Sequence, residues 1–185
     1  MKNALKILTV ILLTSSLTSC DLIKGLTDVE IDTNIEGNLD ILTDEAELKS
    51  TNAHGFNASE TVDVINDDLS DYADLIEDFE TQSIIITVES IDSAGFAVTG
   101  VELLENTEFG ISNTGAGYTW TLTQPWAIEP GFSIELDEAS YGAINDILDD
   151  ELPVTFSADG TCNKGNIHFV LNYDIEVTVV ANPIE

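Results

Sequence analysis

The chain has 185 residues, of which 43% are hydrophobic, with 12 glycines, 4 prolines and a formal net charge of −30. This hydrophobic content provides enough apolar surface to bury, which separates the chain from disordered acidic proteins. Five lysines and no arginine stand against 35 acidic residues. Such a surface repels phosphate backbones, so the charge excludes nucleic acid as a partner.

The first twenty residues have the layout of a secretory signal: Lys2 and Lys6 supply a basic start, and residues 4–13 are an apolar run with one lysine in it. That run is shorter than the roughly 20 residues of a membrane-spanning helix. It ends in LTSC, residues 17–20, which resembles the bacterial lipobox. The resemblance implies cleavage before Cys20 and attachment of acyl chains, such as palmitate, to it. We expect residues 1–19 to be a lipoprotein signal peptide; the alternative is an ordinary secretory signal.

Lipidation at Cys20 would anchor the mature chain without spanning the membrane, because two or more acyl chains hold a protein stably on a bilayer. Three lysines then remain against 35 acidic residues, a net charge of −32. We read residues 20–28 as a tether whose residues reach at most about 3.3–3.6 Å each, so the domain sits close to the lipid. Beside anionic headgroups it needs screening salt or bridging divalent ions, and we expect membrane docking to depend on salt or calcium.

Most of the remaining chain predicts strands. Residues 29–41 alternate between apolar and polar, which is typical of a strand with one wet face, and Gly37 predicts a bulge or bend in it. The last strand, residues 167–180, has the most regular alternation. Further strands are predicted at 56–64, 83–90, 95–101, 117–123 and 131–136, and the stretch 105–117 is read as a turn-rich connection.

Two segments predict helices. From Asn66, a plausible N-cap, apolar residues recur at spacings of three and four opposite a stripe of aspartates, as far as Phe79. A shorter helix is predicted over 137–150 and ends before Pro153. This order predicts a mostly β fold: one antiparallel β-sandwich-like domain over residues 29–185, with two short amphipathic helices.

The order of these features resembles small secreted lipoproteins of Bacteroidota. It comprises the lipobox, the long first strand, the segment INDDLSDYADLIEDFETQ followed by SIIITVESID, and the closing IHFVLNYDIEVTVVANP. The resemblance implies a bacterial cell-envelope address, most simply the outer membrane, and no particular activity. Surface-exported members often carry an acidic cluster after the lipidated cysteine, whereas here Asp21 is followed by LIKGL. Both leaflets therefore stay open.

The inventory for enzyme chemistry is thin. His54 and His168 are the two histidines, and Cys162, read as lying in an exposed turn, is the thiol that remains after lipidation. A Ser-His-Asp triad needs a histidine beside its nucleophile, and His168 falls on the polar side of its predicted strand. Two histidines and one cysteine also lack the usual zinc spacing. We expect no enzyme and no cofactor, while calcium stays open as a ligand of the carboxylates.

The aromatic residues in GYTWTLTQPW are the candidates for ligand binding. Tyr118 and Trp120 share a strand face with Leu122, which favours core packing, and Trp126 follows Pro125 in a predicted turn. Exposed aromatic faces beside carboxylates suit a sugar ring or a protein partner. The sequence thus predicts a structural or accessory lipoprotein that binds an envelope protein, with a glycan- or calcium-binding module as the alternative.

Overall fold

The computed structural model describes residues 28–45 and 53–182. Within them the chain is mostly β and contains one α-helix. The strands are β1 (Val29–Leu42), β2 (His54–Val62), β3 (Ile76–Ser93), β4 (Phe96–Ala97), β5 (Val101–Leu103), β6 (Glu108–Ser112), β7 (Gly117–Thr121), β8 (Trp126–Ile128), β9 (Ser133–Glu135), β10 (Val154–Cys162) and β11 (His168–Ala181). The helical segments are η1 (Ala73–Leu75) and η2 (Glu138–Ser140), both 3-10, and the α-helix α3 (Tyr141–Leu148).

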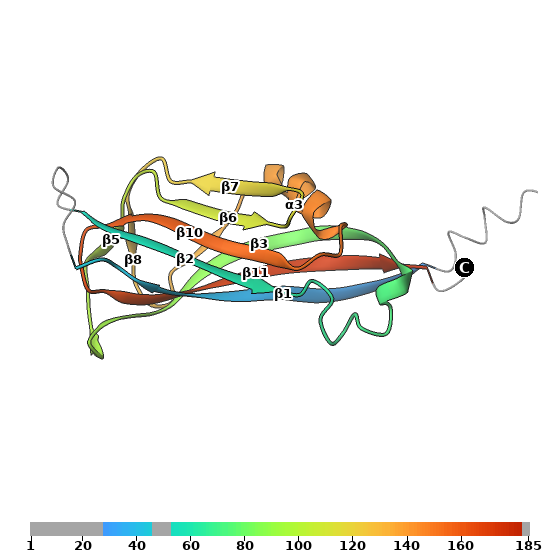
Figure 1. Ribbon diagram of the computed structural model, residues 1–185, viewed down its shortest axis with the longest axis horizontal. Coiled ribbons are helices and arrows are strands. Elements are labelled where there is room, and N and C mark those ends of the chain that lie inside the picture. Colours follow the sequence, from blue (N-terminus) through green and yellow to red (C-terminus); the bar gives the residue numbers. More distant parts are fainter. Residues whose placement is uncertain (1–27, 46–52, 183–185) are drawn as a thin grey trace, which may run out of the picture.

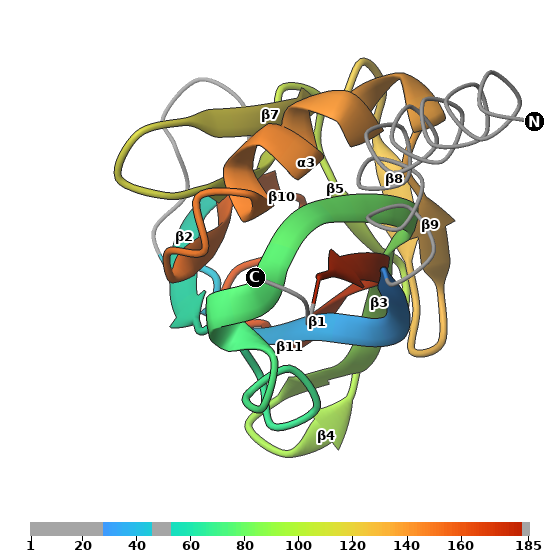
Figure 2. The same cartoon turned by 90° about the vertical axis from the view of Figure 1, so that its right-hand side faces the viewer.

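Two antiparallel sheets lie around one shared core (Figures 1 and 2). The first sheet has the order β1-β11-β3-β4, and β9 also pairs with β3. The second has the order β7-β6-β10-β5-β8, and β2 also pairs with β10. The structure therefore confirms the mostly β, antiparallel, sandwich-like fold. The strands predicted at 29–41, 56–64 and 167–180 form β1, β2 and β11, and the helix predicted over 137–150 forms η2 and α3.

The alternation of β1 sorts its side chains by face. The inward residues Ile35, Leu39 and Ile41 are buried, and the polar residues between them are exposed. β11 follows the same rule and pairs with β1 over fourteen residues without a break in register. Because successive side chains of a strand point to opposite sides, this register buries the inward residues of both strands at once.

The bulge predicted at Gly37 does not form, because β1 keeps its register through Gly37, which lies opposite Tyr173. The register shifts occur between β3 and β11 instead. Gly37 has a different role: a Cβ there would collide with Cδ2 of Phe156 and lie 2.9 Å from its Cε2. The glycine thus lets an aromatic ring of the second sheet rest on the backbone of the first, the other common reason for a glycine within a strand.

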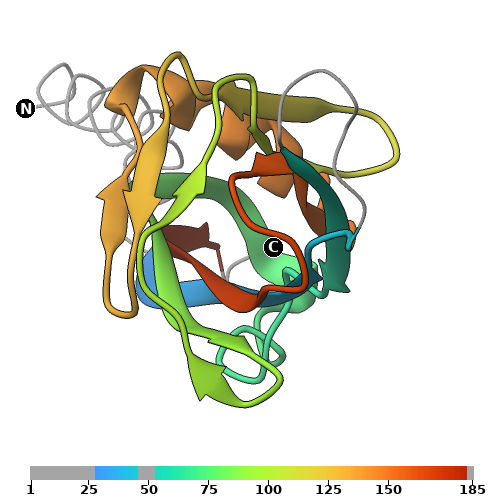
Figure 3. The same ribbon diagram turned by 90° about the vertical axis from the view of Figure 1, so that its left-hand side faces the viewer.

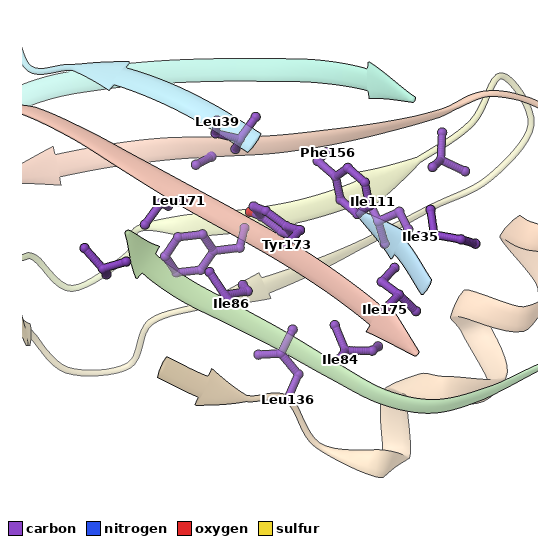
Figure 4. Packing of buried hydrophobic residues seen from close by; sticks show 14 of the residues in the cluster. Ile35, Leu39, Ile84, Ile86, Ile111, Leu136, Phe156, Leu171, Tyr173 and Ile175 are labelled. Carbon is purple, nitrogen blue, oxygen red and sulfur yellow. The ribbon is translucent and has the colours of Figure 1, made fainter. Parts of the chain in front are cut away.

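The core fills the space between the sheets (Figure 4). Phe156 of β10 lies 4.9 Å from Tyr173 of β11, measured between ring centroids, and both are fully buried. The Tyr173 hydroxyl donates a 2.8 Å hydrogen bond to the carbonyl of Ser157. Burial raises the pKa of this hydroxyl far above its usual value, so it stays a donor throughout the physiological range.

The helix predicted from Asn66 to Phe79 was wrong. Residues 66–75 form successive turns that end in η1, and from Ile76 onward the chain belongs to β3. Asn66 does cap the first turn, since its Oδ1 accepts the N–H groups of Asp68 and Leu69 at 3.0 and 3.2 Å. A helix would place like charges one turn apart along the aspartate stripe, which is unfavourable. Pairing of β3 with β11 buries Phe79 instead.

Two further expectations were wrong. The connection predicted over 105–117 contains β6, whose Phe109 and Ile111 are buried. Cys162 does not lie in an exposed turn: it ends β10 and is fully buried, and desolvation raises the pKa of its thiol. Both segments are rich in turn-forming residues, but each lies beside a partner strand that sequence alone does not reveal.

The helix α3 covers the edge of β3 at a stretch where neither β4 nor β9 pairs with it. Asn145 Oδ1 accepts a 2.9 Å hydrogen bond from the N–H of Thr81 and a 2.6 Å bond from its hydroxyl. Asp149 Oδ1 accepts a 2.9 Å bond from the N–H of Phe79. The helix side chains thus take the place of a neighbouring strand, which protects an edge that would otherwise offer free N–H groups.

We predict that Gly37→Ala destabilises the domain by about 1–3 kcal/mol, the usual cost of overpacking, because the Phe156 ring has to move. Gly142→Ala is the matched control: Gly142 lies in α3, and a Cβ added there would have nothing within 4 Å, so this change should raise stability by about 0.5 kcal/mol. Urea unfolding of the wild type and the two variants measures both changes in the free energy of unfolding. Equal effects of the two substitutions would contradict the packing role of Gly37.

Candidate functional site

The two ends of the sandwich differ (Figure 1). Val29 pairs with Ala181 at one end, which we call the base, and Leu42 pairs with His168 at the other, which we call the tip. With a rise of about 3.3 Å per residue, the fourteen residues of β1 place base and tip about 45 Å apart. The β3–β4 hairpin and the strands β5 and β8 also lie at the tip.

The hairpin between β3 and β4 carries an exposed aromatic side chain. Ala94 and Gly95 form its two-residue turn, with φ of 51° and 82°, and the N–H of Gly95 donates a 2.9 Å bond to Asp92 Oδ1. Both central residues of such a turn need a positive φ, which suits the twist of the flanking strands. Phe96 follows directly and is 76% exposed, more than any other large hydrophobic residue described. Figure 3 looks onto the tip, where this hairpin projects from the body.

Beside the hairpin lies a hollow of about 470 Å³, which we call the fork hollow. It opens where β5 and β8 separate beyond their last pair, Val101 with Ile128. One wall is the segment 98–100 and the other is the turn 129–132. The complete lining is Val98, Thr99, Gly100, Val101, Ala127, Ile128, Glu129, Pro130 and Phe132. The volume falls within the range of sites that bind small molecules or single side chains.

Hydrogen bonds hold both walls in place. The turn at 129–132 is fixed to β3, since Gly131 N donates to the Val88 carbonyl at 2.7 Å and Val88 N donates to the Phe132 carbonyl at 2.8 Å. On the other wall, Asn163 Nδ2 donates to the Gly100 carbonyl at 3.2 Å, and Lys164 Nζ donates to the Thr99 carbonyl. The hollow is therefore built into the fold, because neither wall is an unsupported loop.

The predicted ligand-binding aromatics do not line this hollow and belong mostly to the packing. Trp126 is half-buried in β8, not in a turn, and it stacks on Phe109 with ring centroids 5.9 Å apart. Phe132 lies 6.4 Å from Trp126. Tyr118 and Trp120 are both half-buried on β7 and make an edge contact at 4.9 Å. Phe109 covers one face of the Trp126 ring, and Phe132 lies tilted against the same ring at 57°, so Trp126 is part of the packing of this region.

Residues that the sequence pattern did not indicate make up the tip surface instead. The stretch 95–101 reads as one strand, but it splits into the exposed pair Phe96–Ala97 and the short strand β5, and the residues between form a wall of the hollow. Gly95 and Gly100, with φ of 82° and 67°, flank this split. The two glycines are the one signal in the sequence that indicated a break.

The charge around the tip is mainly negative. Exposed carboxylates there include Glu102, Glu105, Glu129 and Asp159. Lys164 is the one basic residue besides histidine in residues 28–45 and 53–182, and it contacts a backbone carbonyl, not a carboxylate. A second hollow of about 530 Å³ lies at the opposite end of the β5–β8 pair, next to Leu103 and Trp126, and is lined by Ala53, Leu104, Glu105, Asn106, Pro125, Asp159, Gly160 and Thr161.

His168 links three strands at the tip. Its Nε2 lies 2.7 Å from Asp40 Oδ1 on β1, and its Nδ1 lies 3.1 Å from Asp92 Oδ2 on β3. An imidazolium has one N–H for each carboxylate, so hydrogen bonds to Asp92 and then Asp40 raise the pKa of His168. The His168 bond in turn lowers the pKa of Asp92. The side chain is 35% exposed and paired, where the sequence pattern indicated a solvent-facing residue.

The other predicted chemical groups are not assembled into a site. His54 is buried at the start of β2, with Nδ1 2.9 Å from the Asp44 carbonyl, and it lies opposite Cys162 in the sheet. Among the described residues no three histidine, cysteine or acidic side chains are grouped to hold a metal ion. No helix of the described part is long and apolar enough to cross a membrane. Cys20 and the lipobox lie outside the described residues.

No family model matches the sequence, and no curated protein matches it. Among solved structures, the chain is similar to the decameric BFDV capsid protein, with a TM-score of 0.37 and 10% identity, over 82% of this chain and 98% of that one. It is also similar to a structure of Desmodium yellow mottle tymovirus, with a TM-score of 0.31 and 11% identity, over 85% of this chain and 90% of that one. At these TM-scores the similarity contributes nothing to the assignment of a function.

We predict that the His168 bridge makes stability depend on pH. A raised histidine pKa contributes stability that is complete below the unfolded value of 6.5 and is lost as pH rises through the folded value. The lowered pKa of Asp92 contributes stability above 3.8 that is lost as pH falls. The wild-type chain should therefore have a higher Tm than a His168→Gln variant, and this Tm difference should be largest near pH 5.5 and smallest at pH 9.

The comparison with His168→Gln at each pH removes the general effect of carboxylate repulsion, which both proteins share. The charged groups that face His168 are Asp40 and Asp92, while its neighbours Leu42 and Val170 are apolar. When both proteins also carry Asp92→Asn, the Tm difference caused by His168→Gln should depend less on pH, because one of the two carboxylate partners is gone. If the Tm difference between wild type and His168→Gln is the same at pH 5.5 and pH 9, the bridge does not act in this way.

Proposed function

We propose that this chain is a lipid-anchored protein of the bacterial cell envelope, an accessory component that holds a protein partner at the tip of its domain. The observation that carries the proposal is the exposed Phe96, which lies two residues before Val98, a lining residue of the fork hollow. Contiguous apolar surface on a monomeric protein often marks an interaction site. The LTSC segment supports the anchor, through its resemblance to the lipobox.

The anchor and the tip would work together through their separation. Cys20 precedes Val29 by nine residues, which span at most about 30 Å. The base is thus tied near the lipid, and the length of β1 carries the tip about 45 Å away from the base. The acidic surface of the domain is repelled by anionic headgroups, which also favours a position of the tip away from the membrane. Such a geometry suits a protein that presents a binding surface at a distance from the membrane.

Little in the structure favours an enzyme. His54 and Cys162 are both buried, and desolvation raises the pKa of the Cys162 thiol, which disfavours the thiolate that a nucleophile requires. His168 is held between two carboxylates that do not border either hollow. The glycan alternative is less favoured, because Trp126 packs against Phe109 and Phe132 and does not line the fork hollow. We therefore place protein binding first.

The anchor makes a direct prediction for Cys20→Ser expressed in a bacterial host. The variant should lose labelling by an alkyne analogue of palmitate and move from the membrane fraction to the soluble fraction, because no thiol remains for the acyl chains. Cys162→Ala is the matched control and should keep both the label and the membrane fraction. If Cys20→Ser stays labelled and membrane-bound, the lipobox interpretation is wrong.

The partner is tested by affinity purification of the intact chain from mildly solubilised envelopes of its native host, with and without a calcium chelator. We expect one co-purifying protein in a fixed molar ratio, identified by mass spectrometry. Its loss on chelation would assign calcium and the carboxylates a part in the contact, and its retention would show that the contact does not need calcium. Recovery of the chain alone under both conditions would contradict the accessory role.

A further inference from the structure

We infer that the fork hollow and Phe96 form a docking site for a partner segment in which basic residues flank apolar side chains. This inference rests on the proposed function and specifies the chemistry of its partner. The walls of the hollow carry Val98, Pro130 and Phe132, which suit an apolar side chain, and Phe96 stands exposed two residues before Val98. Apolar anchors that insert into such pockets carry most of the energy of protein interfaces.

The charge decides what flanks that anchor. Glu129 lines the hollow, and Glu102 lies on β5, where it pairs with Ala127, another lining residue. Both carboxylates are exposed, and neither has an ion-pair partner in the described part of the chain. A partner that covers the hollow would bring its own side chains beside these carboxylates. Lysine or arginine there gains from the pairing, whereas an acidic side chain is repelled.

The same charge disfavours the other occupants. A second copy of this chain would bring two strongly acidic tips together, which like-charge repulsion opposes. Anionic lipid headgroups are repelled for the same reason. A small neutral ligand would fill the hollow but would leave Phe96 uncovered. A basic and apolar protein segment satisfies both the hollow and Glu129. Its basic side chains belong beside Glu129, because Lys164 lies at the other wall, bonded to the Thr99 carbonyl.

The hollow is preorganised for this task. Hydrogen bonds from Gly131 to Val88 and from Asn163 to Gly100 fix its two walls, and its floor, Val101 and Ile128, belongs to a strand pair. A rigid site loses little conformational entropy on binding, so a short segment is sufficient. The residues to vary are exposed, which means that their substitution leaves the core intact.

The test uses the intact chain in nanodiscs and three fluorescent peptides: GKLKFKG as the probe, GELEFEG with reversed charge and GKSKSKG without apolar side chains. Fluorescence anisotropy measures Kd at physiological ionic strength, about 0.15 M. We expect GKLKFKG to bind at least about tenfold more tightly than either of the other two. Equal binding of GKSKSKG would show that charge alone attracts the peptide and would overturn the inference, as would no binding of GKLKFKG.

Matched variants locate the contact. Phe96→Ser at the tip is compared with Leu152→Ser, which removes another exposed hydrophobic residue, in the segment that leads into the start of β10, the end of that strand away from the tip. Glu129→Lys is compared with Asp71→Lys, an equal charge change in the turns before η1. The tip variants should each weaken binding of GKLKFKG at least about fivefold, and the two controls should change it less than about twofold. Equal weakening by tip variants and controls would overturn the inference.

The two proposals fail separately. If affinity purification yields a stoichiometric partner whose recovery is unaffected by Phe96→Ser and Glu129→Lys, the accessory role stands, but both its placement at the tip and the docking site are wrong. If no partner is recovered, the accessory role fails, whatever the peptides do. Circular dichroism of each variant, with a Tm within about 2 °C of the wild type, confirms that the domain remains folded.

Discussion

The two sheets depend on one close contact at the centre of the sandwich. Gly37 lacks a side chain, so the ring of Phe156 rests on the backbone of β1. Tyr173 lies opposite Gly37 in the register, packs against the same ring and donates its hydroxyl to the Ser157 carbonyl. Consecutive residues of β10 thus contact the first sheet in two ways. Since the buried hydroxyl would be costly to leave unpaired, this contact fixes how the sheets sit on each other.

The acidity of the chain is compatible with this fold because the alternation of the strands keeps carboxylates on the outer faces. On the outer face of the first sheet they alternate with amides and hydroxyls. Asp174 lies opposite Glu36 but bonds to Asn34 Nδ2 at 2.8 Å, and Asp32 accepts a 2.8 Å bond from Thr178. Opposed like charges weaken a sheet, and these neutral partners offset part of the repulsion. His168 closes the same face at the tip with its two carboxylate bonds.

At the tip, the alternation of apolar and polar residues no longer accounts for which side chains are buried. Phe96 is exposed although it follows a long and regular strand, and β5 and β8 separate after three pairs to leave the fork hollow. Places where a sequence departs from its own folding pattern are expected to carry function. The base shows no comparable departure among the described residues: there the ends of β1, β11 and β3 meet, and the chain enters β1.

The sequence by itself determined the long strands, the mostly β class and the short second helix, because period-2 alternation over fourteen residues and the stop at Pro153 are local signals. It also predicts the lipid anchor at Cys20, which stays a prediction. Only the tertiary structure decided the segment after Asn66, where pairing with β11 outweighed helical spacing, and the burial of Cys162 beside its partner strands. It alone brought Phe96, Glu129 and Phe132 to one end. Phe96 lies far in the chain from Glu129 and Phe132, and the strand pairings that bring them to one end have no signature in any single stretch.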